Sequence, residues 1–133
     1  CSCVQCCSQH GSLKALSFEL RRFDTLMPEP RITIIIPTRQ RCDVLESSLR
    51  TATSQDYENL EIIVSDNFSN DGTADVVMRA NDRRIRYLNT GKRVCMSHNW
   101  EFALSHVSDG WVTFMGDDDG LLPGAISTVA DII

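Results

Sequence analysis

The chain has 133 residues, of which 42% are hydrophobic and 23% are charged, as in ordinary soluble globular domains. This length and composition predict one packed domain and exclude a disordered, collagen-like or coiled-coil chain. The net charge of −5 argues against a nucleic-acid partner, whose phosphates require a basic face, so a local group of cations must meet any anionic ligand.

The first 30 residues differ from the rest of the chain and form a predicted N-terminal lead. Four of the six cysteines lie at positions 1, 3, 6 and 7, and no evenly spread disulfide framework is visible, which favours a reducing compartment. A soft-metal site in this cluster is disfavoured because the sequence lacks the second, separated ligand pair of a zinc module. Apolar residues at helical spacing predict a short helix over 13–26, and Pro28 and Pro30 mark a boundary after it.

We expect the chain to be a piece of a longer protein, because it starts at Cys1 and ends in an apolar run without a helix stop signal. Its apolar runs are far shorter than the roughly 20 residues that cross a bilayer, so we expect no membrane span in this chain. The expected location is the cytoplasm, or the cytoplasmic face of a membrane in a longer parent.

From residue 31 onward, short apolar runs alternate with stretches of helical length. The runs at 32–36, 60–64, 85–88 and 111–115 are the predicted strands, and the predicted helices span 43–53, 71–80 and 97–106. This alternation predicts an α/β fold with a mostly parallel central sheet and helices on both faces. Ligands of such sheets bind beyond the carboxyl ends of the strands.

Polar clusters follow three of the predicted strands, so we expect them to meet at one edge of the sheet. They are Pro37-Thr38-Arg39-Gln40-Arg41 after the first strand, Asp66-Asn67 with residues 68–73 after the second, and Gly116-Asp117-Asp118-Asp119-Gly120 after the fourth.

The acidic triplet Asp117, Asp118 and Asp119 is a candidate metal site. Adjacent carboxylates repel each other unless they are exposed or neutralised, and oxygen ligands favour a hard divalent cation, here Mn²⁺ or Mg²⁺. A solvated acidic turn is the alternative. An EF-hand is excluded because Leu121 and Pro123 occupy positions that would have to supply ligands.

Other residues at the strand ends are candidates for contacts with a nucleotide. Asp66 can accept a hydrogen bond from a base N–H or a ribose hydroxyl, or it can form an Asx turn with Asn67. Arg41, Lys92 and Arg93 can compensate the charge of a diphosphate, although each is also an ordinary surface residue. The sequence carries neither a phosphate loop nor the glycine fingerprint of dinucleotide-binding oxidoreductases.

In their order and spacing, three stretches resemble the inverting family 2 glycosyltransferases with a GT-A nucleotide-sugar-binding fold. They are residues 32–38, 62–73 and 111–123, and the resemblance covers residues 31–133. It implies a Rossmann-like GT-A half-domain over 31–133, truncated relative to the family, preceded by the separate lead of residues 1–30.

The resemblance also implies roles for individual residues. Pro37 and Thr38 would pack on the nucleotide, and Asp66 would contact its base. Within the acidic triplet, Asp117 would face the ribose or the metal, and Asp118 would be the most direct metal ligand. The metal would bridge the two phosphates and stabilise the leaving nucleoside diphosphate.

The sequence departs from the family pattern at two places. Arg39 and Gln40 replace an aromatic–Asn pair, and Gly116 stands where many members have another aspartate. Family members also continue into an acceptor-binding half that supplies the general base, so we assign no catalytic base within this chain.

The resemblance therefore implies the donor-binding half of a metal-dependent glycosyltransferase. It would move a sugar, with inversion, from a UDP-, GDP- or dTDP-sugar to a carbohydrate, lipid or protein acceptor. Two alternatives stay open. One is a non-catalytic fragment that serves as an interaction or nucleotide-binding module, and the other is a metal-dependent hydrolase that uses the aspartate triplet.

Overall fold

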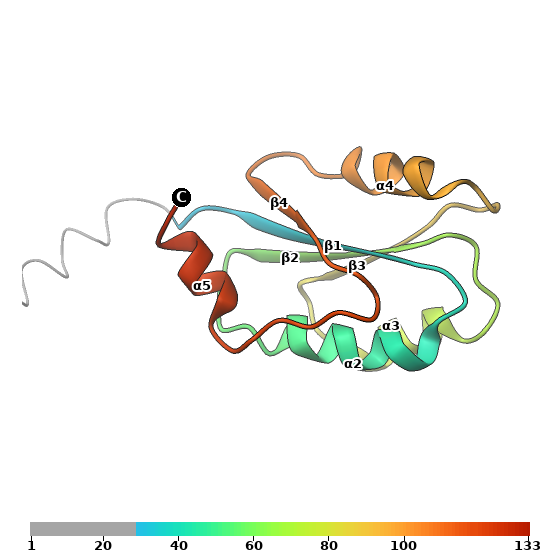
Figure 1. Ribbon diagram of the computed structural model, residues 1–133, viewed down its shortest axis with the longest axis horizontal. Helices are drawn as coiled ribbons and strands as arrows, with labels where there is room; N and C mark the ends of the chain where they lie inside the picture. Colours follow the sequence, from blue (N-terminus) through green and yellow to red (C-terminus); the bar gives the residue numbers. More distant parts are fainter. Residues whose placement is uncertain (1–28) are drawn as a thin grey trace, which may run out of the picture.

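A computed structural model describes residues 29–133 as a parallel β-sheet flanked by helices (Figure 1). The four strands lie in the order β3-β2-β1-β4, so β1 and β2 are central. In chain order the elements are β1 (Ile32–Thr38), α2 (Cys42–Thr53), β2 (Leu60–Asp66), α3 (Thr73–Ala80), β3 (Ile85–Asn89), α4 (Met96–Leu104), β4 (Trp111–Phe114) and α5 (Ala125–Ala130). The predicted α/β class is confirmed, whereas the cysteine cluster and the helix predicted over 13–26 lie outside the described residues.

The two central strands are apolar because both of their faces are covered. Strand β1 pairs with β2 along its whole length and with β4 from Ile32 to Ile35. Alternate side chains point to opposite faces of a strand, so Ile34 and Ile36 join one core cluster and Ile35 joins another. A continuous β-branched run is what such a doubly covered parallel strand requires.

Helices cover both faces of the sheet, as predicted (Figure 1). One face packs against α2, α3 and α5 through Leu45, Leu49, Val76, Val77 and Ile126. The other face is covered by α4, whose Ala103 packs against Ile35 and Ile63.

Two reciprocal hydrogen bonds hold α4 against β2. The Ser65 hydroxyl donates to Asn99 Oδ1 at 2.8 Å, and Asn99 Nδ2 donates to the Ser65 carbonyl at 3.1 Å. Both side chains are buried. Because paired polar groups avoid the cost of burial without a partner, this contact fixes the position of α4 beside the strand ends.

Strand β1 ends at Thr38, two residues past Ile36, the last residue of the predicted strand. The Ile35 carbonyl accepts a hydrogen bond from Met115 N–H on the β4 side, at 2.9 Å. Pro37, two residues later, faces the same side beyond the last residue of β4. Its missing N–H therefore breaks no ladder bond, and the strand continues against β2.

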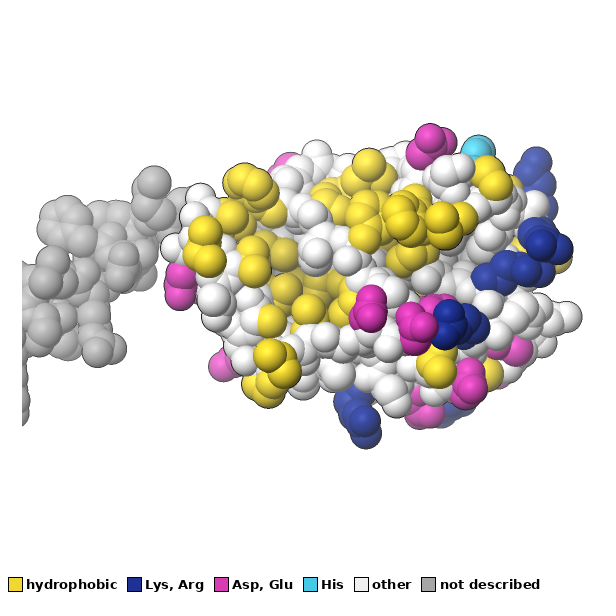
Figure 2. Space-filling view, viewed as in Figure 1, with side chains coloured by type: hydrophobic (Ala, Val, Ile, Leu, Met, Phe, Trp, Pro, Cys, Tyr) yellow, Lys and Arg dark blue, Asp and Glu magenta, His cyan; other side chains and the backbone are white. Residues whose placement is uncertain are grey.

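Strand β4 is an edge strand whose apolar side chains are only partly covered. Trp111 is 55% exposed and Phe114 is 41% exposed. Phe114 stacks on Trp100 of α4, with 5.1 Å between the ring centroids. Figure 2 shows the hydrophobic side chains gathered over β4 and α4. Among residues 29–133 no helix combines the length and the apolar character that a bilayer span needs.

Candidate functional site

The loops that follow β1, β2 and β4 meet at one edge of the sheet, as predicted. The Thr38 hydroxyl donates to Asp117 Oδ2 at 2.8 Å and so joins the end of β1 to the loop after β4. Asn67 N–H donates to the Thr38 carbonyl at 3.0 Å, and Gln40 N–H donates to the Ser69 hydroxyl at 2.8 Å. These contacts tie the three polar clusters together.

A cleft of about 460 Å³ opens at this edge, within the range of small-molecule binding sites. Five of the residues predicted to bind a nucleotide line it: Pro37, Thr38, Arg41, Arg93 and Asp117. They come from the end of β1, from the loops after β1 and β4, and from the segment that precedes α4.

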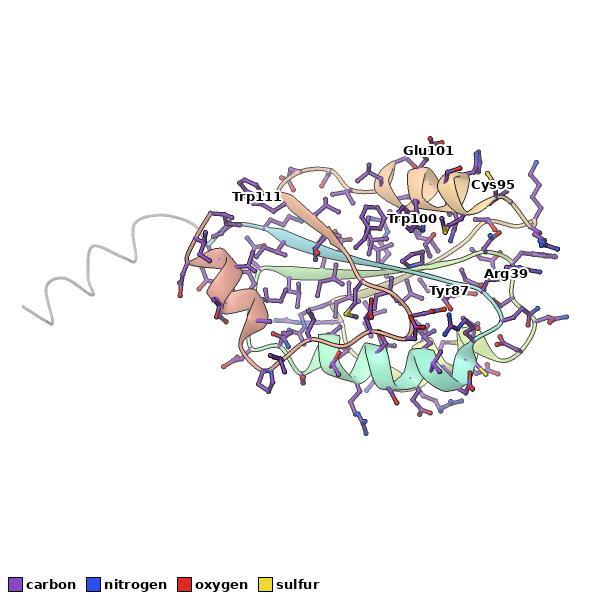
Figure 3. All side chains as sticks on the ribbon, in the orientation of Figure 1. Arg39, Tyr87, Cys95, Trp100, Glu101 and Trp111 are labelled. Carbon is purple, nitrogen blue, oxygen red and sulfur yellow. The ribbon has the colours of Figure 1, made fainter. Side chains whose placement is uncertain are left out.

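The cleft carries more positive than negative charge, although the whole chain is acidic. Arg39, Arg41 and Arg93 line it together with one carboxylate, that of Asp117. Arg39 is not among the predicted ligands, because the sequence marks it only as a departure from the family pattern. Its Nε atom is buried and has no hydrogen-bond partner among residues 29–133. The side chain lies at the end of β1 (Figure 3), and an anion in the cleft would supply the missing acceptor.

Asp66 and Lys92 are outside the lining of this cleft. The Asp66 side chain is buried, and its carboxylate accepts hydrogen bonds from Ser69 N–H at 3.0 Å and Asn89 Nδ2 at 2.9 Å. It also accepts from the Ser69 and Tyr87 hydroxyls. Burial is the main cause that raises the pKa of Tyr87, and the hydrogen bond to Asp66 is the next. Asp66 thus holds the loop after β2, and its contact with a nucleotide base stays a prediction.

Asn67 positions the wall of the cleft that precedes α4. Its Nδ2 donates to the Val94 carbonyl at 2.9 Å, and its Oδ1 accepts from Val94 N–H at 2.8 Å. The sequence predicts for Asn67 only a place in an Asx turn with Asp66. Pairing with a backbone 27 residues away leaves no local signal in the sequence.

The start of α4 also belongs to the cleft. The exposed Cys95 thiol shares a hydrogen bond with the Ser97 hydroxyl. This hydrogen bond is the main cause that lowers the pKa of Cys95, and a hydrogen bond from the backbone N–H of His98 is the next. Figure 3 shows Cys95 at the beginning of the helix and Trp100 further along it. No side chain arranged as a catalytic base for this thiol contacts it among the described residues, so we assign it no chemistry.

Arg41 pairs with two members of the acidic triplet. Its Nη1 lies 3.3 Å from Asp117 Oδ1, and its Nη2 donates to Asp118 Oδ2 at 2.8 Å. The hydrogen bond from Arg41 is the main cause that lowers the pKa of Asp118. Asp119 turns the other way, and its Oδ2 accepts from Gly116 N–H at 3.1 Å.

This arrangement bears on whether a divalent cation fits. Asp117 and Asp118 converge on one positive group, and carboxylate oxygens are the ligands that Mg²⁺ and Mn²⁺ prefer. Within residues 29–133, no three His, Cys, Asp or Glu side chains are grouped to hold a metal. The pair fits a cation that takes its other ligands from phosphate and water, as Mg²⁺ commonly does. Asp119, which the sequence also predicts as a ligand, accepts the hydrogen bond from Gly116 N–H here, and its role as a metal ligand stays a prediction.

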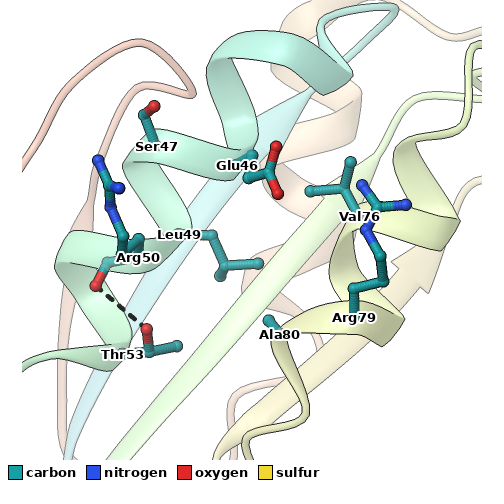
Figure 4. A pocket seen from close by; sticks show the side chains of 8 residues that line it. All are labelled: Glu46, Ser47, Leu49, Arg50, Thr53, Val76, Arg79 and Ala80. Carbon is teal, nitrogen blue, oxygen red and sulfur yellow. Dashed lines mark hydrogen bonds between the residues drawn. The ribbon is translucent and has the colours of Figure 1, made fainter.

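A second hollow of about 350 Å³ lies between α2 and α3, away from the strand ends (Figure 4). Glu46, Arg50 and Arg79 line it, so it mixes both charges. None of the predicted site residues reaches it.

A parallel α/β sheet with a cationic cleft and a carboxylate pair beyond its strand ends defines the class of nucleotide-binding α/β domains. Within this class, the chain belongs to glycosyl transferase family 2, whose family model matches residues 33–133. The family and the GT-A fold expected from the sequence motifs are thereby confirmed.

A curated relative agrees with this family, and two solved structures agree with the fold. The GalNAc(5)-diNAcBac-PP-undecaprenol beta-1,3-glucosyltransferase of Campylobacter jejuni is 41% identical over 103 residues, which are 75% of this chain and 33% of that protein. The mannosyltransferase PcManGT from Pyrobaculum calidifontis, solved in complex with GDP-Man and Mn²⁺, superposes with a TM-score of 0.67 at 26% identity, over 87% of this chain and 37% of that one. S. aureus TarS 1-349, solved in complex with UDP-GlcNAc, has a TM-score of 0.69 at 20% identity, over 77% of this chain and 31% of that one. Among the curated relatives that it matches, the chain spans between 15% and 37% of each protein's length.

Proposed function

We propose that residues 31–133 are the donor-binding half-domain of a metal-dependent glycosyltransferase, with residues 1–30 as a separate lead. The complete enzyme would transfer a sugar from a nucleoside-diphosphate sugar to an acceptor, with inversion. The observation that carries this proposal is the cleft lined by Arg39, Arg41 and Arg93 next to Asp117. Arginine side chains that cluster at the strand ends of an α/β sheet, in a protein that is acidic as a whole, are suited to bind a phosphorylated ligand. Family membership supports a nucleotide sugar as that ligand.

Different residues of the cleft would contact the nucleoside and the diphosphate of such a donor. Pro37 and Thr38 would pack against the nucleoside, since both line the cleft where β1 ends. Arg39 and Arg93 would donate hydrogen bonds to the diphosphate, whose oxygens match the fork of a guanidinium. Thr38 would also hold Asp117 in place through their hydrogen bond.

Asp117 and Asp118 would hold the divalent cation, and PcManGT, to whose structure this chain is similar, was solved in complex with GDP-Man and Mn²⁺. When bound, the cation would neutralise the charge of the departing diphosphate. The arginines of the cleft would orient the donor and offset the repulsion between its phosphates and the neighbouring carboxylates. We assign no residue within 29–133 as the base that deprotonates the acceptor.

Calorimetric titration of the folded chain with UDP, GDP and dTDP, each with and without Mn²⁺, tests this function. We expect one of the nucleotides to bind, and to bind more tightly when Mn²⁺ is present. Asp118→Asn is expected to remove the effect of Mn²⁺ because it removes a carboxylate of the pair. If a folded chain binds none of the three nucleotides, the proposed function is wrong.

A second function, that of a non-catalytic interaction module, is favoured by one observation. Trp111, Phe114 and Leu104 leave an apolar surface exposed on β4 and α4, and contiguous exposed apolar patches commonly mark interfaces. Sedimentation of the isolated chain discriminates between the two. Self-association without nucleotide affinity would favour the module, and a monomer that binds nucleotide would favour the donor-binding domain.

A further inference from the structure

We infer that Arg41 is a built-in counter-ion of the Asp117–Asp118 pair. The divalent cation displaces the Arg41 guanidinium from this pair, and the guanidinium then turns to the diphosphate of the donor. The inference rests on the proposed function, and it gives Arg41 a position on the carboxylates in addition to the predicted one on the diphosphate. The cation and the donor would consequently bind cooperatively. Arg41 pairs with the carboxylates while the site is empty, and it pairs with the phosphates once the cation and the donor are bound.

The first support is the geometry of the guanidinium. Arg41 Nη1 lies 3.3 Å from Asp117 Oδ1, and Nη2 lies 2.8 Å from Asp118 Oδ2. One cationic group therefore stands between two carboxylates that follow each other in the sequence. A divalent cation held by the same two carboxylates would need the position that the guanidinium takes.

The second support is that nothing else among residues 29–133 holds the Arg41 side chain. Its hydrogen bonds and ion pairs are those with Asp117 and Asp118 alone, and the side chain is 46% exposed. The backbone of Arg41 is fixed at the start of α2, where its carbonyl accepts from Leu45 N–H at 3.0 Å. Only the side chain has to move, and rotamer changes of exposed side chains are fast.

The third support is charge. With Arg41 in place, the two carboxylates carry one compensating positive charge, and a divalent cation would add two more to the same group. Repulsion between the cation and the guanidinium then favours the release of Arg41. Arg41 already lines the cleft with Arg39 and Arg93, so a diphosphate offers the displaced group an acceptor that it can bind with two N–H donors.

This exchange makes the two ligands of the site depend on each other. Without a donor, the pairing of Arg41 with the carboxylates competes with the cation and weakens its binding. With a donor present, the phosphates draw Arg41 away and leave the carboxylates to the cation. Linkage is reciprocal, so the cation must raise the affinity for the donor by the same factor.

Titration of the chain with Mn²⁺ alone, followed by the loss of the free-ion signal in electron paramagnetic resonance, tests the competition directly. Arg41→Gln removes the counter-ion, and we expect it to bind Mn²⁺ about threefold more tightly than the unsubstituted chain, as suits a partly exposed ion pair. Arg41→Lys keeps a positive charge and is expected to stay close to the unsubstituted chain. Arg50→Gln, on the same helix but outside the cleft, is the matched control.

The same variants are then titrated with UDP and GDP in the presence and absence of Mn²⁺. We expect Arg41→Gln to lower nucleotide affinity and to reduce the factor by which Mn²⁺ improves it. Circular dichroism establishes that each variant is folded. If Arg41→Gln lowers nucleotide affinity but leaves the affinity for Mn²⁺ unchanged, Arg41 is a simple phosphate ligand and the inference is overturned while the proposed function stands. If no nucleotide binds to any folded variant, the proposed function itself fails.

Discussion

The hydrogen bonds between Asn67 and Val94 support the wall of the cleft, so Asn67→Ala tests how the site is built. The variant loses two hydrogen bonds to the backbone, of 2.9 and 2.8 Å. At about 1 kcal/mol net for each bond, the free energy of unfolding should fall by about 2 kcal/mol. Urea denaturation followed by circular dichroism measures this change.

Nucleotide affinity should fall together with stability, because Arg93 and Cys95 flank Val94 and line the cleft. Freeing this short segment adds an ordering cost to binding, which we put at about tenfold in the dissociation constant. Asn67→Asp keeps the acceptor for Val94 N–H but sets its second carboxylate oxygen against the Val94 carbonyl oxygen, so it should lower stability and nucleotide affinity at least as much as Asn67→Ala.

Asn70→Ala is the matched control, since this exposed asparagine lies in the same loop as Asn67 and accepts one hydrogen bond, from Gln40 in the loop after β1. It should change stability by less than about 0.5 kcal/mol, as most surface substitutions do. An Asn67→Ala chain as stable as the Asn70→Ala chain, with unchanged nucleotide affinity, would refute the positioning role of Asn67.

Two further predictions concern the loop after β4 and the acid sensitivity of the fold. A Cβ at Gly116 would lie 2.7 Å from Asp119 Oδ2, so Gly116→Ala should break the hydrogen bond between these residues. The free energy of unfolding, measured by urea denaturation, should fall by about 1 kcal/mol. An equal fall in an Asp119→Ala background would contradict this cause. The hydrogen bond from Arg84 lowers the pKa of Asp82. Because the folded pKa is the lower one, the unfolded chain takes up the proton first, and the stability from this pair is present above about pH 4 and lost as the pH falls through the folded pKa. Denaturation between pH 6 and pH 3 should show a shallower acid loss for Asp82→Asn, and an unchanged slope would argue against the contribution of the pair.

Local pattern predicted the four strands and the helices α2, α3 and α4, but not α5. Runs such as Ile32–Ile36 suit a strand that is covered on both faces, and a helix between successive runs allows the strands to pair in parallel, whereas their order in the sheet is known only from the structure. The convergence of the polar clusters followed from that topology, because the carboxyl ends of parallel strands share one edge. The ends of the strands were less predictable: Pro37 remains in β1 only because β4 stops opposite Ile35.

The sequence by itself therefore determined the α/β class, the family and the loops that form the site, since each depends on residue types at short, regular spacing. The tertiary structure decided what individual side chains do there. It turned Asp119 back onto Gly116, satisfied Asp66 with Ser69, Tyr87 and Asn89, and set Arg41 between Asp117 and Asp118. The physical reason is distance along the chain: Arg41 meets its carboxylates across 77 residues, and only the folded sheet, by joining the ends of β1 and β4, brings those charges together.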